Sequence, residues 1–282
     1  AFRSGAAILA EKVVDIHHCL VVHPDAELAD VRTVVRNALG PRRRPAHFCD
    51  LLRAEDFPTM FTGLDPDRLK QNLFPLAASP RFRAMTASAY LSLFDVERET
   101  QFAAVTLTYK RDFAFIGFRG TDTSRTGWKE DFNMTFSAPV PAQEQALRYL
   151  ETMAPHLPRR IYLGGHSKGG NLAEYAALTA TPAVQDRIAH LYNHDGPGFM
   201  PGTFSAADYA PLVGRMTKQV PEDSMVGILM ESATPTVTVK ATGRGFEQHS
   251  VYRWEVADAT PAADATPTAF ATVSALPERT ER

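Results

Sequence analysis

The feature that most constrains the fold is a serine between glycines, where a predicted strand gives way to a predicted helix. Residues 160–163 are typical of a short buried strand, and residues 171–180 form an alanine-rich stretch typical of a helix. Residues 165–169, between them, read Gly-His-Ser-Lys-Gly. A chain that passes from a buried strand through a tight turn into a helix is best accommodated as one unit of a parallel sheet.

The same alternation extends over the middle of the chain. Residues 101–109 and 113–118 are rich in β-branched and aromatic side chains and flank a polar turn, which predicts a β-hairpin. An amphipathic helix and three further strands are predicted, in chain order, at residues 143–157, 188–192, 216–220 and 236–240. The expected fold class is therefore α/β, with a mostly parallel central sheet and helices on both faces.

The two ends of the chain differ from this middle. Apolar side chains at helical spacing predict two helices that end at Gly40 and Pro41. Beyond residue 256, small and polar residues dominate, which is typical of a loosely ordered segment. We divide the 282 residues into an N-terminal helical extension and linker (1–56), a central domain (57–256) and a flexible Ala/Thr/Pro-rich tail (257–282).

The composition argues against several kinds of partner. A net charge of -2 offers no bulk attraction to nucleic acid. No apolar run approaches the roughly 18 residues of a membrane span, so we expect no transmembrane segment. Two cysteines, Cys19 and Cys49, cannot form a disulfide framework and favour a reducing, cytoplasmic location. None of these features predicts an oligomeric state.

Histidines and cysteines near the N-terminus could in principle bind zinc. They lack the paired short spacings of structural zinc sites, and His17 and His18 point away from each other on a helix. We therefore expect neither a metal nor any other cofactor.

Two chemistries could use the glycine-rich turn. A phosphate-binding loop needs a lysine directly followed by serine or threonine, whereas the order here is Ser167-Lys168. The segment instead matches G-x-S-x-G, in which a sharp strand-to-helix turn exposes a nucleophilic serine. The helix N-terminus supplies positive potential, and the Lys168 N–H is the expected first donor to an oxyanion. The alternative is a purely structural turn.

A nucleophilic Ser167 would need a general base, and His249 is the favoured one among nine histidines. It follows the last predicted strand, as the chain order serine, acid, histidine requires, and Gly243 and Gly245 place it on a loop. His166 is too close in sequence to reach Ser167. A surface histidine without a catalytic role is the alternative.

Three groups of residues occur in the order found in a known superfamily. They are Phe118-Arg119-Gly120-Thr121-Asp122 with the segment Gly-Trp-Lys-Glu-Asp-Phe-Asn at 127–133, the glycine-rich turn at 165–173, and residues 193–199 with the later segments 221–229 and 248–249. In these stretches the chain resembles the α/β-hydrolase superfamily, specifically the lipase class 3-like branch with its bacterial hydrolases of undefined substrate.

This resemblance extends over roughly residues 74–256. It implies an α/β-hydrolase domain at 57–256. It also implies that Thr121 provides the second oxyanion contact through its backbone N–H, while its hydroxyl orders the loop.

The acid that would support His249 has two candidates. Class 3 lipases carry it in a D-x-V segment after the strand that corresponds to residues 216–220, but Ser224 stands at that position here. Asp195 follows the predicted strand at 188–192, where some α/β-hydrolase lipases place their acid, and a Gly-Pro-Gly turn can fix it. We expect Asp195 to be the acid, with Asp223 as the alternative.

The predicted function is that of a serine hydrolase of the carboxylesterase or lipase type, which cleaves an ester through an acyl-enzyme on Ser167. Its substrate would be a small-molecule or lipid ester. A lipid ester would suit an apolar lid formed by Trp128, Phe132, Met134 and Phe136, although these side chains fit a core equally well. Peptides and thioesters are alternative substrates. A noncatalytic hydrolase-fold module that binds an acyl ligand or a protein partner is the competing prediction.

Overall fold

The computed structural model describes residues 46–52, 54, 57, 66–80, 82–122 and 124–255. The predicted N-terminal helices, Cys19 and the C-terminal tail lie outside the described residues. The division of the chain at residues 57 and 257 therefore stays a prediction. No helix in the described part of the chain is both long and apolar enough to cross a membrane.

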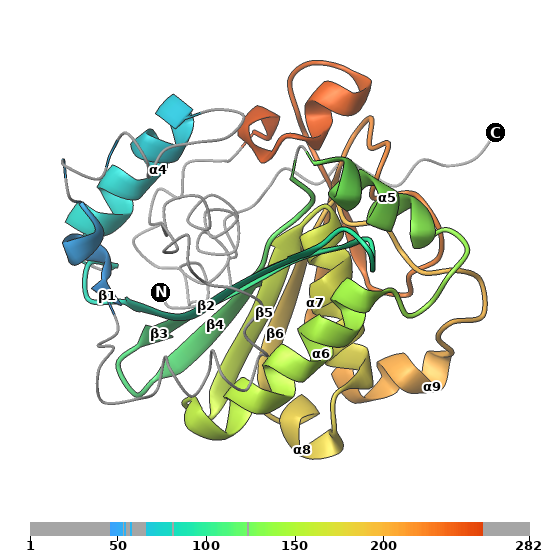
Figure 1. Ribbon diagram of the computed structural model, residues 1–282, viewed down its shortest axis with the longest axis horizontal. Helices are drawn as coiled ribbons and strands as arrows, with labels where there is room; N and C mark the ends of the chain where they lie inside the picture. The colour runs from blue at the N-terminus through green and yellow to red at the C-terminus, as the bar shows by residue number, and fades with distance from the viewer. Residues whose placement is uncertain are drawn as a thin grey trace, which may run out of the picture.

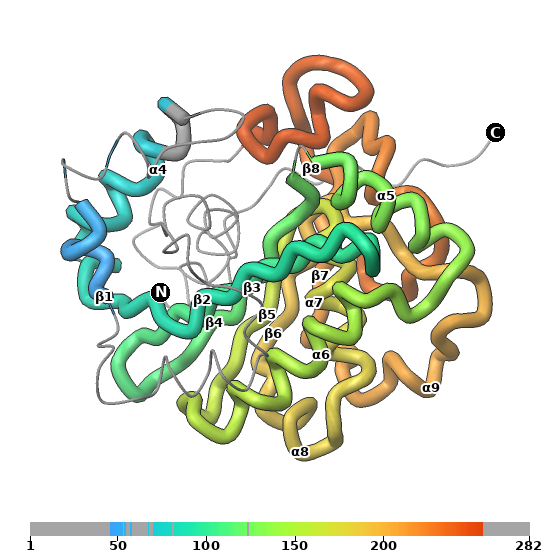
Figure 2. The backbone as a smooth tube through the Cα atoms, in the orientation of Figure 1, coloured from blue at the N-terminus to red at the C-terminus, as the bar shows by residue number. Residues whose placement is uncertain are grey.

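One eight-stranded sheet forms the centre of the structure, and its strands lie side by side in sequence order (Figures 1 and 2). The strands are β1 (Ala46–His47), β2 (Thr86–Asp95), β3 (Thr100–Tyr109), β4 (Phe113–Phe118), β5 (Arg160–His166), β6 (Ile188–His194), β7 (Met216–Pro221) and β8 (Thr236–Val239). Strands β1 to β4 pair antiparallel, and β4 to β8 pair parallel.

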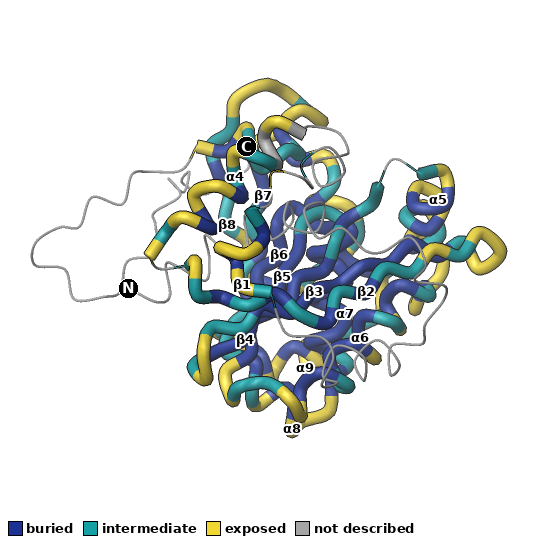
Figure 3. The backbone as a smooth tube through the Cα atoms, turned by 60° about the vertical axis from the view of Figure 1, so that its left-hand side comes forward, coloured by how far each residue is buried: buried dark blue, intermediate teal, exposed yellow. Residues whose placement is uncertain are grey.

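Helices cover both faces of this sheet, as predicted. They are α4 (Pro66–Ala78), α5 (Arg125–Asn133), α6 (Pro141–Met153), α7 (Lys168–Thr179), α8 (Pro182–Gln185) and α9 (Ala206–Tyr209). Leu150 of α6 and Leu172 of α7 pack with Ile116 of β4 in one core cluster. Leu73 of α4 packs with Phe115, the neighbouring residue of β4, in the cluster on the other face. All six residues of β4 are buried, as expected for a strand covered on both sides (Figure 3).

The predicted hairpin and the strands that follow it are confirmed as β3 to β8. The antiparallel strand β2 was missed, because its first half reads Thr-Ala-Ser-Ala and lacks the large β-branched side chains that mark a strand. It forms because β1 and β3 supply backbone partners on both sides. Helix α5 was also missed, since no element was predicted over its residues.

The parallel strands bring distant parts of the sequence to one edge of the sheet. Strands β4 to β7 all end at this edge, so the segments that follow them lie near one another. Two 3-10 helices, η5 (Gly245–His249) and η6 (Val251–Arg253), drawn red in Figure 1, lie at the same end of the sheet as α5. Crevices beyond the carboxyl ends of parallel strands are common ligand sites, and the predicted site residues gather here.

Candidate active site

Ser167 occupies the turn between β5 and α7 in a strained backbone conformation. Its φ of 55° and ψ of -132° lie outside the regions that a serine normally adopts. Its N–H donates to the His194 carbonyl at 2.9 Å, and its own carbonyl accepts from Gly170 N at 2.9 Å. A Cβ on Gly169 would lie 2.2 Å from the Phe118 carbonyl oxygen, so only glycine permits β4 to approach the turn this closely.

The structure brings Asp195 and His249 together. The Nδ1 atom of His249 lies 2.6 Å from Oδ2 of Asp195, whose side chain is fully buried. Asp195 directly follows β6, whereas His249 ends η5, so the contact joins residues 54 positions apart. Asp223 is exposed, and its backbone N–H donates to Gln248 Oε1 at 2.8 Å. His249 therefore faces Asp195 rather than the alternative acid.

The second oxygen of Asp195 is also bound. Its Oδ1 accepts from the Ser224 hydroxyl at 2.5 Å and from Gly227 N at 3.1 Å. The Asp195 N–H donates to the Gln219 carbonyl of β7 at 2.7 Å. The carboxylate is thus held between the segments that follow β6 and β7, with one oxygen directed at His249.

His166 supports the loop of His249, a contact that the sequence analysis missed. Its Nε2 lies 2.6 Å from the His249 carbonyl oxygen, and the two imidazole rings are 4.4 Å apart. A carbonyl only accepts, so Nε2 of His166 carries the hydrogen. Burial and the neighbouring His249 hold the pKa of His166 well below its usual range, which keeps its ring neutral.

No hydrogen bond joins Ser167 and His249. Within the described part of the chain, the Ser167 hydroxyl makes none. Because Nδ1 of His249 is taken by Asp195, Nε2 is the nitrogen left to act on Ser167 or on a bound molecule. Such contacts are often long in ligand-free structures and shorten when substrate binds.

Thr121 follows β4, and its side chain is fixed by Asp131 of α5. The Thr121 hydroxyl lies 2.6 and 2.8 Å from the two oxygens of the Asp131 carboxylate, to which it donates. Burial raises the pKa of Asp131, opposed by the charge of Lys168 and by the bond from Thr121. Because the hydroxyl is engaged, the backbone N–H is the group of Thr121 available to an oxyanion; that role stays a prediction.

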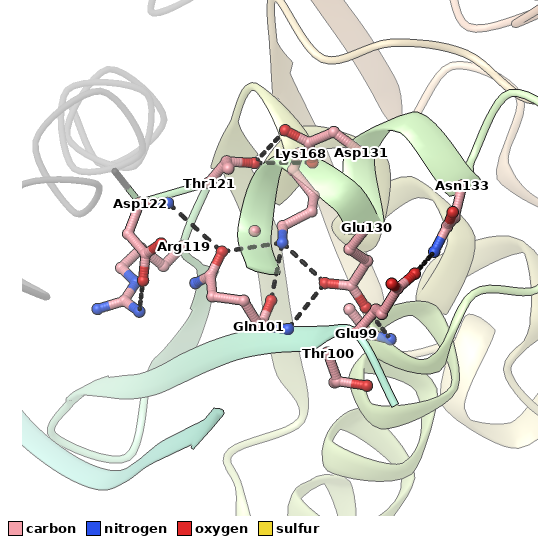
Figure 4. A network of polar contacts seen from close by, with 12 residues as sticks. Glu99, Thr100, Gln101, Arg119, Thr121, Asp122, Glu130, Asp131, Asn133 and Lys168 are labelled. Carbon is pink, nitrogen blue, oxygen red and sulfur yellow. Dashed lines mark hydrogen bonds and ion pairs between the residues drawn. The ribbon is translucent and has the colours of Figure 1, made fainter. Parts of the chain in front are cut away.

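The side chain of Lys168 forms a buried ion pair that only the structure reveals. Its Nζ donates to Glu130 Oε2 at 2.9 Å and to the carbonyl and side-chain oxygens of Gln101 at 2.8 and 2.9 Å (Figure 4). Glu130 also accepts from Gln101 N at 2.9 Å and from Ala142 N at 3.0 Å. The network ties the start of α7 to β3, α5 and α6.

Helix α5 presents two kinds of side chain. Its first turn is capped by Ser124, whose hydroxyl accepts from Gly127 N at 3.0 Å. Its inner side carries Glu130 and Asp131, which face Lys168 and Thr121. Three of the four side chains proposed for a lid are exposed, namely Trp128, Phe132 and Phe136. The fourth, Met134, is buried in the core. A lid can therefore involve only the exposed three.

The described residues contain no group of three or more His, Cys, Asp or Glu side chains placed to hold a metal ion.

Comparison with known proteins assigns the chain to a family. The model of the Mbeg1-like family matches residues 76–273, more than half of the chain. The chain belongs to the Mbeg1-like family. A search of curated protein sequences gave no match for this Mbeg1-like chain.

Two solved lipases are similar to the Mbeg1-like chain over part of its length. M37 lipase is 15% identical with a TM-score of 0.37; the alignment covers 57% of this chain and 62% of M37 lipase, less than two thirds. A triacylglycerol lipase from Penicillium expansum is 12% identical with a TM-score of 0.36, over 56% of this chain and 71% of that one. The sheet and its strand-turn-helix unit have the arrangement of an α/β hydrolase. The class 3-like branch and a bacterial source stay predictions.

The buried ion pair predicts that removing one of its two charges costs more unfolding free energy than removing both. Lys168→Met leaves the Glu130 carboxylate buried without its counter-charge, so we expect a loss of about 3–5 kcal/mol of unfolding free energy. Lys168→Met with Glu130→Gln should recover at least half of that loss. Urea unfolding measures both.

The neighbouring pair Lys129–Glu99 is the matched control, because it also involves a residue of α5 but is partly exposed and joins the helix to the turn before β3. Lys129→Met should cost much less unfolding free energy than Lys168→Met, because solvent screens an exposed pair. Equal losses for Lys129→Met and Lys168→Met would contradict this account of the network.

Buried His194 predicts that stability falls with acid. Burial lowers its pKa to about 4, and this effect is opposed only in part by the side chain of Gln219. Below pH ~6.5 the unfolded chain binds a proton at His194, whereas the folded chain stays unprotonated there until the pH nears 4. The contribution of His194 to the free energy of unfolding is therefore fully present above pH ~6.5 and is lost as the pH falls toward 4. His194→Leu should reduce this slope by up to about 1.4 kcal/mol per pH unit in urea unfolding. Exposed His156→Gln is the control, and identical slopes for His194→Leu and the parent would contradict the prediction.

Proposed function

We propose that this protein is a serine hydrolase that cleaves an ester through an acyl-enzyme on Ser167. The observation that carries the proposal is the 2.6 Å contact of His249 Nδ1 with buried Asp195, at the sheet edge that also holds the strained Ser167 turn. A carboxylate at Nδ1 fixes the tautomer that leaves Nε2 free to accept a proton.

The proposed reaction has two stages. The Ser167 Oγ attacks the ester carbonyl while His249 Nε2 takes the Ser167 proton. Asp195 stabilises the resulting imidazolium. The oxyanion of the tetrahedral intermediate accepts from the backbone N–H groups of Lys168 and Thr121. His249 then gives its proton to the departing alcohol, and a water molecule activated by the same ring hydrolyses the acyl-enzyme.

Helix α5 would set the spacing of the two oxyanion donors. Consecutive residues of this helix, Glu130 and Asp131, hold Lys168 and Thr121 respectively. Both donors are therefore fixed before substrate arrives, which is how electrostatic stabilisation avoids reorganisation during the reaction. Lys168 also stands in the first turn of α7, where the helix dipole favours negative charge.

The proposed substrate is an ester with an apolar acyl group. Exposed apolar side chains occur on α5 and just after it, on the segment that follows β7, and on the 3-10 helix that ends at His249. They are Trp128, Phe132, Phe136, Met225, Ile228, Leu229 and Phe246. The Phe246 ring lies 5.3 Å from that of His249, which places apolar surface directly beside the proposed base. Thioesters and peptides are alternatives within the same mechanism. A cytoplasmic location stays a prediction.

One observation favours a second candidate, a noncatalytic module that binds an acyl ligand or a protein. The Ser167 hydroxyl makes no hydrogen bond within the described part of the chain, so the histidine is not yet engaged with it. The same site could then bind an acyl group without reacting. Covalent labelling distinguishes the two.

The first test is reaction with a fluorophosphonate probe. Ser167 should be labelled in the native protein, and Ser167→Ala should lose labelling and lower ester turnover by roughly 10⁴-fold or more, because the nucleophile is removed. Turnover is measured with p-nitrophenyl esters of increasing chain length, and mass spectrometry locates the label. A folded parent protein that is neither labelled nor active would favour the binding module.

The second test separates the two acids. Asp195→Asn should preserve folding and lower kcat by roughly 10⁴-fold, because an amide no longer fixes the histidine tautomer or stabilises its charge. Asp223→Asn is the matched control and should cost less than about tenfold, since the exposed Asp223 side chain is not the one that faces His249. The reverse order of effects would remove Asp195 from the proposal.

A further inference from the structure

Ser224 stands where the class 3 lipases that the chain resembles carry their acid, and its environment is unusual for a loop serine. It is buried in the segment that follows β7. Its hydroxyl oxygen accepts from Gly227 N at 3.0 Å and lies 2.5 Å from Asp195 Oδ1. The serine therefore faces the carboxylate that precedes it by 29 positions.

These contacts determine the direction of the Ser224 proton. An ionised carboxylate only accepts, so the hydroxyl must donate to Asp195. The bond from Gly227 occupies one lone pair of the hydroxyl oxygen and limits its rotation. Gly227 N also reaches Asp195 Oδ1 directly, at 3.1 Å. Two donors thus hold one carboxylate oxygen from the β7 side.

The other oxygen of the same carboxylate contacts His249. Rotation of the Asp195 carboxylate would break its bond with Ser224 and its bond with His249 together. A hydrogen bond to a buried charge is stronger than one between neutral groups, so loss of the Ser224 donor should loosen the orientation of Asp195.

We propose that Ser224 is a positioning residue that acts on His249 through Asp195. This inference rests on the proposed hydrolase function for its kinetic consequence, but the hydrogen-bonded chain Ser224–Asp195–His249 can be measured without catalysis. In this chain, the segment after β6 supplies the charge, and the segment after β7 supplies the donor that directs it.

The test compares Ser224→Ala with Ser224→Thr. Ser224→Ala should lower kcat about tenfold and change KM by less than about twofold, because the lost bond acts on the proton-transfer step rather than on substrate. Ser224→Thr keeps the hydroxyl and should restore most of kcat. The low-field NMR signal of the His249 Nδ1 proton should broaden or move in Ser224→Ala and return in Ser224→Thr.

Ser232→Ala is the matched control. Its hydroxyl also donates to a buried carboxylate, that of Glu174 at 2.6 Å, but this carboxylate contacts neither His249 nor Asp195 in the described part of the chain. It should leave kcat and the His249 signal unchanged. The proposal is overturned if Ser224→Ala has the same kcat and the same His249 signal as Ser232→Ala.

A second variant decides the question if Ser224→Ala does not fold. Ser224→Cys keeps the shape of the side chain but offers Asp195 a much weaker donor. It should lower kcat and move the His249 Nδ1 signal in the direction expected for Ser224→Ala, and no change in either would overturn the proposal. An unlabelled parent protein would instead reject the hydrolase function, while the NMR comparison would still test Ser224.

Discussion

The buried ion pair between Lys168 and Glu130 is the interaction on which the geometry of the site depends. Two charges removed from water are stable only when each is neutralised and hydrogen-bonded. Here Lys168 and Glu130 neutralise each other, and Gln101 forms hydrogen bonds with both. Because Lys168 directly follows Ser167, the pair anchors the strained turn to β3 and α5. The turn thus keeps its shape through contacts that are buried in the protein.

The same helix extends this control to the loop after β4. Asp131 holds Thr121 while its neighbour Glu130 holds Lys168, so the two predicted oxyanion donors are fixed by adjacent residues of α5. The outer side of α5 carries exposed Trp128 and Phe132. One short helix therefore connects the apolar surface near the site with the polar groups proposed to perform the chemistry.

Asp195 contacts His249 from a position that differs from the pattern of class 3 lipases. Asp195 comes from the segment after β6, and Ser224, at the position after β7 where those lipases place an aspartate, binds its second oxygen. Adjacent parallel strands end at the same edge, so either segment can reach the same point in space. Because the ends of β6 and β7 lie close together, the segment after β6 can supply the Asp195 carboxylate while the segment after β7 supplies a hydrogen bond to it.

The sequence by itself determined the parallel strands, α6 and α7, because their periodicity and glycines are local properties. It also identified Ser167, since a G-x-S-x-G turn between a strand and a helix leaves little choice of conformation. Strand β2 and helix α5 were missed, because pairing with neighbours and a buried Glu130 stabilise them more than local propensity does. Only the tertiary structure decided which acid faces His249. It alone also showed what the buried side chains of Lys168 and Ser224 contact. These contacts join residues tens of positions apart, and no local pattern encodes such distances.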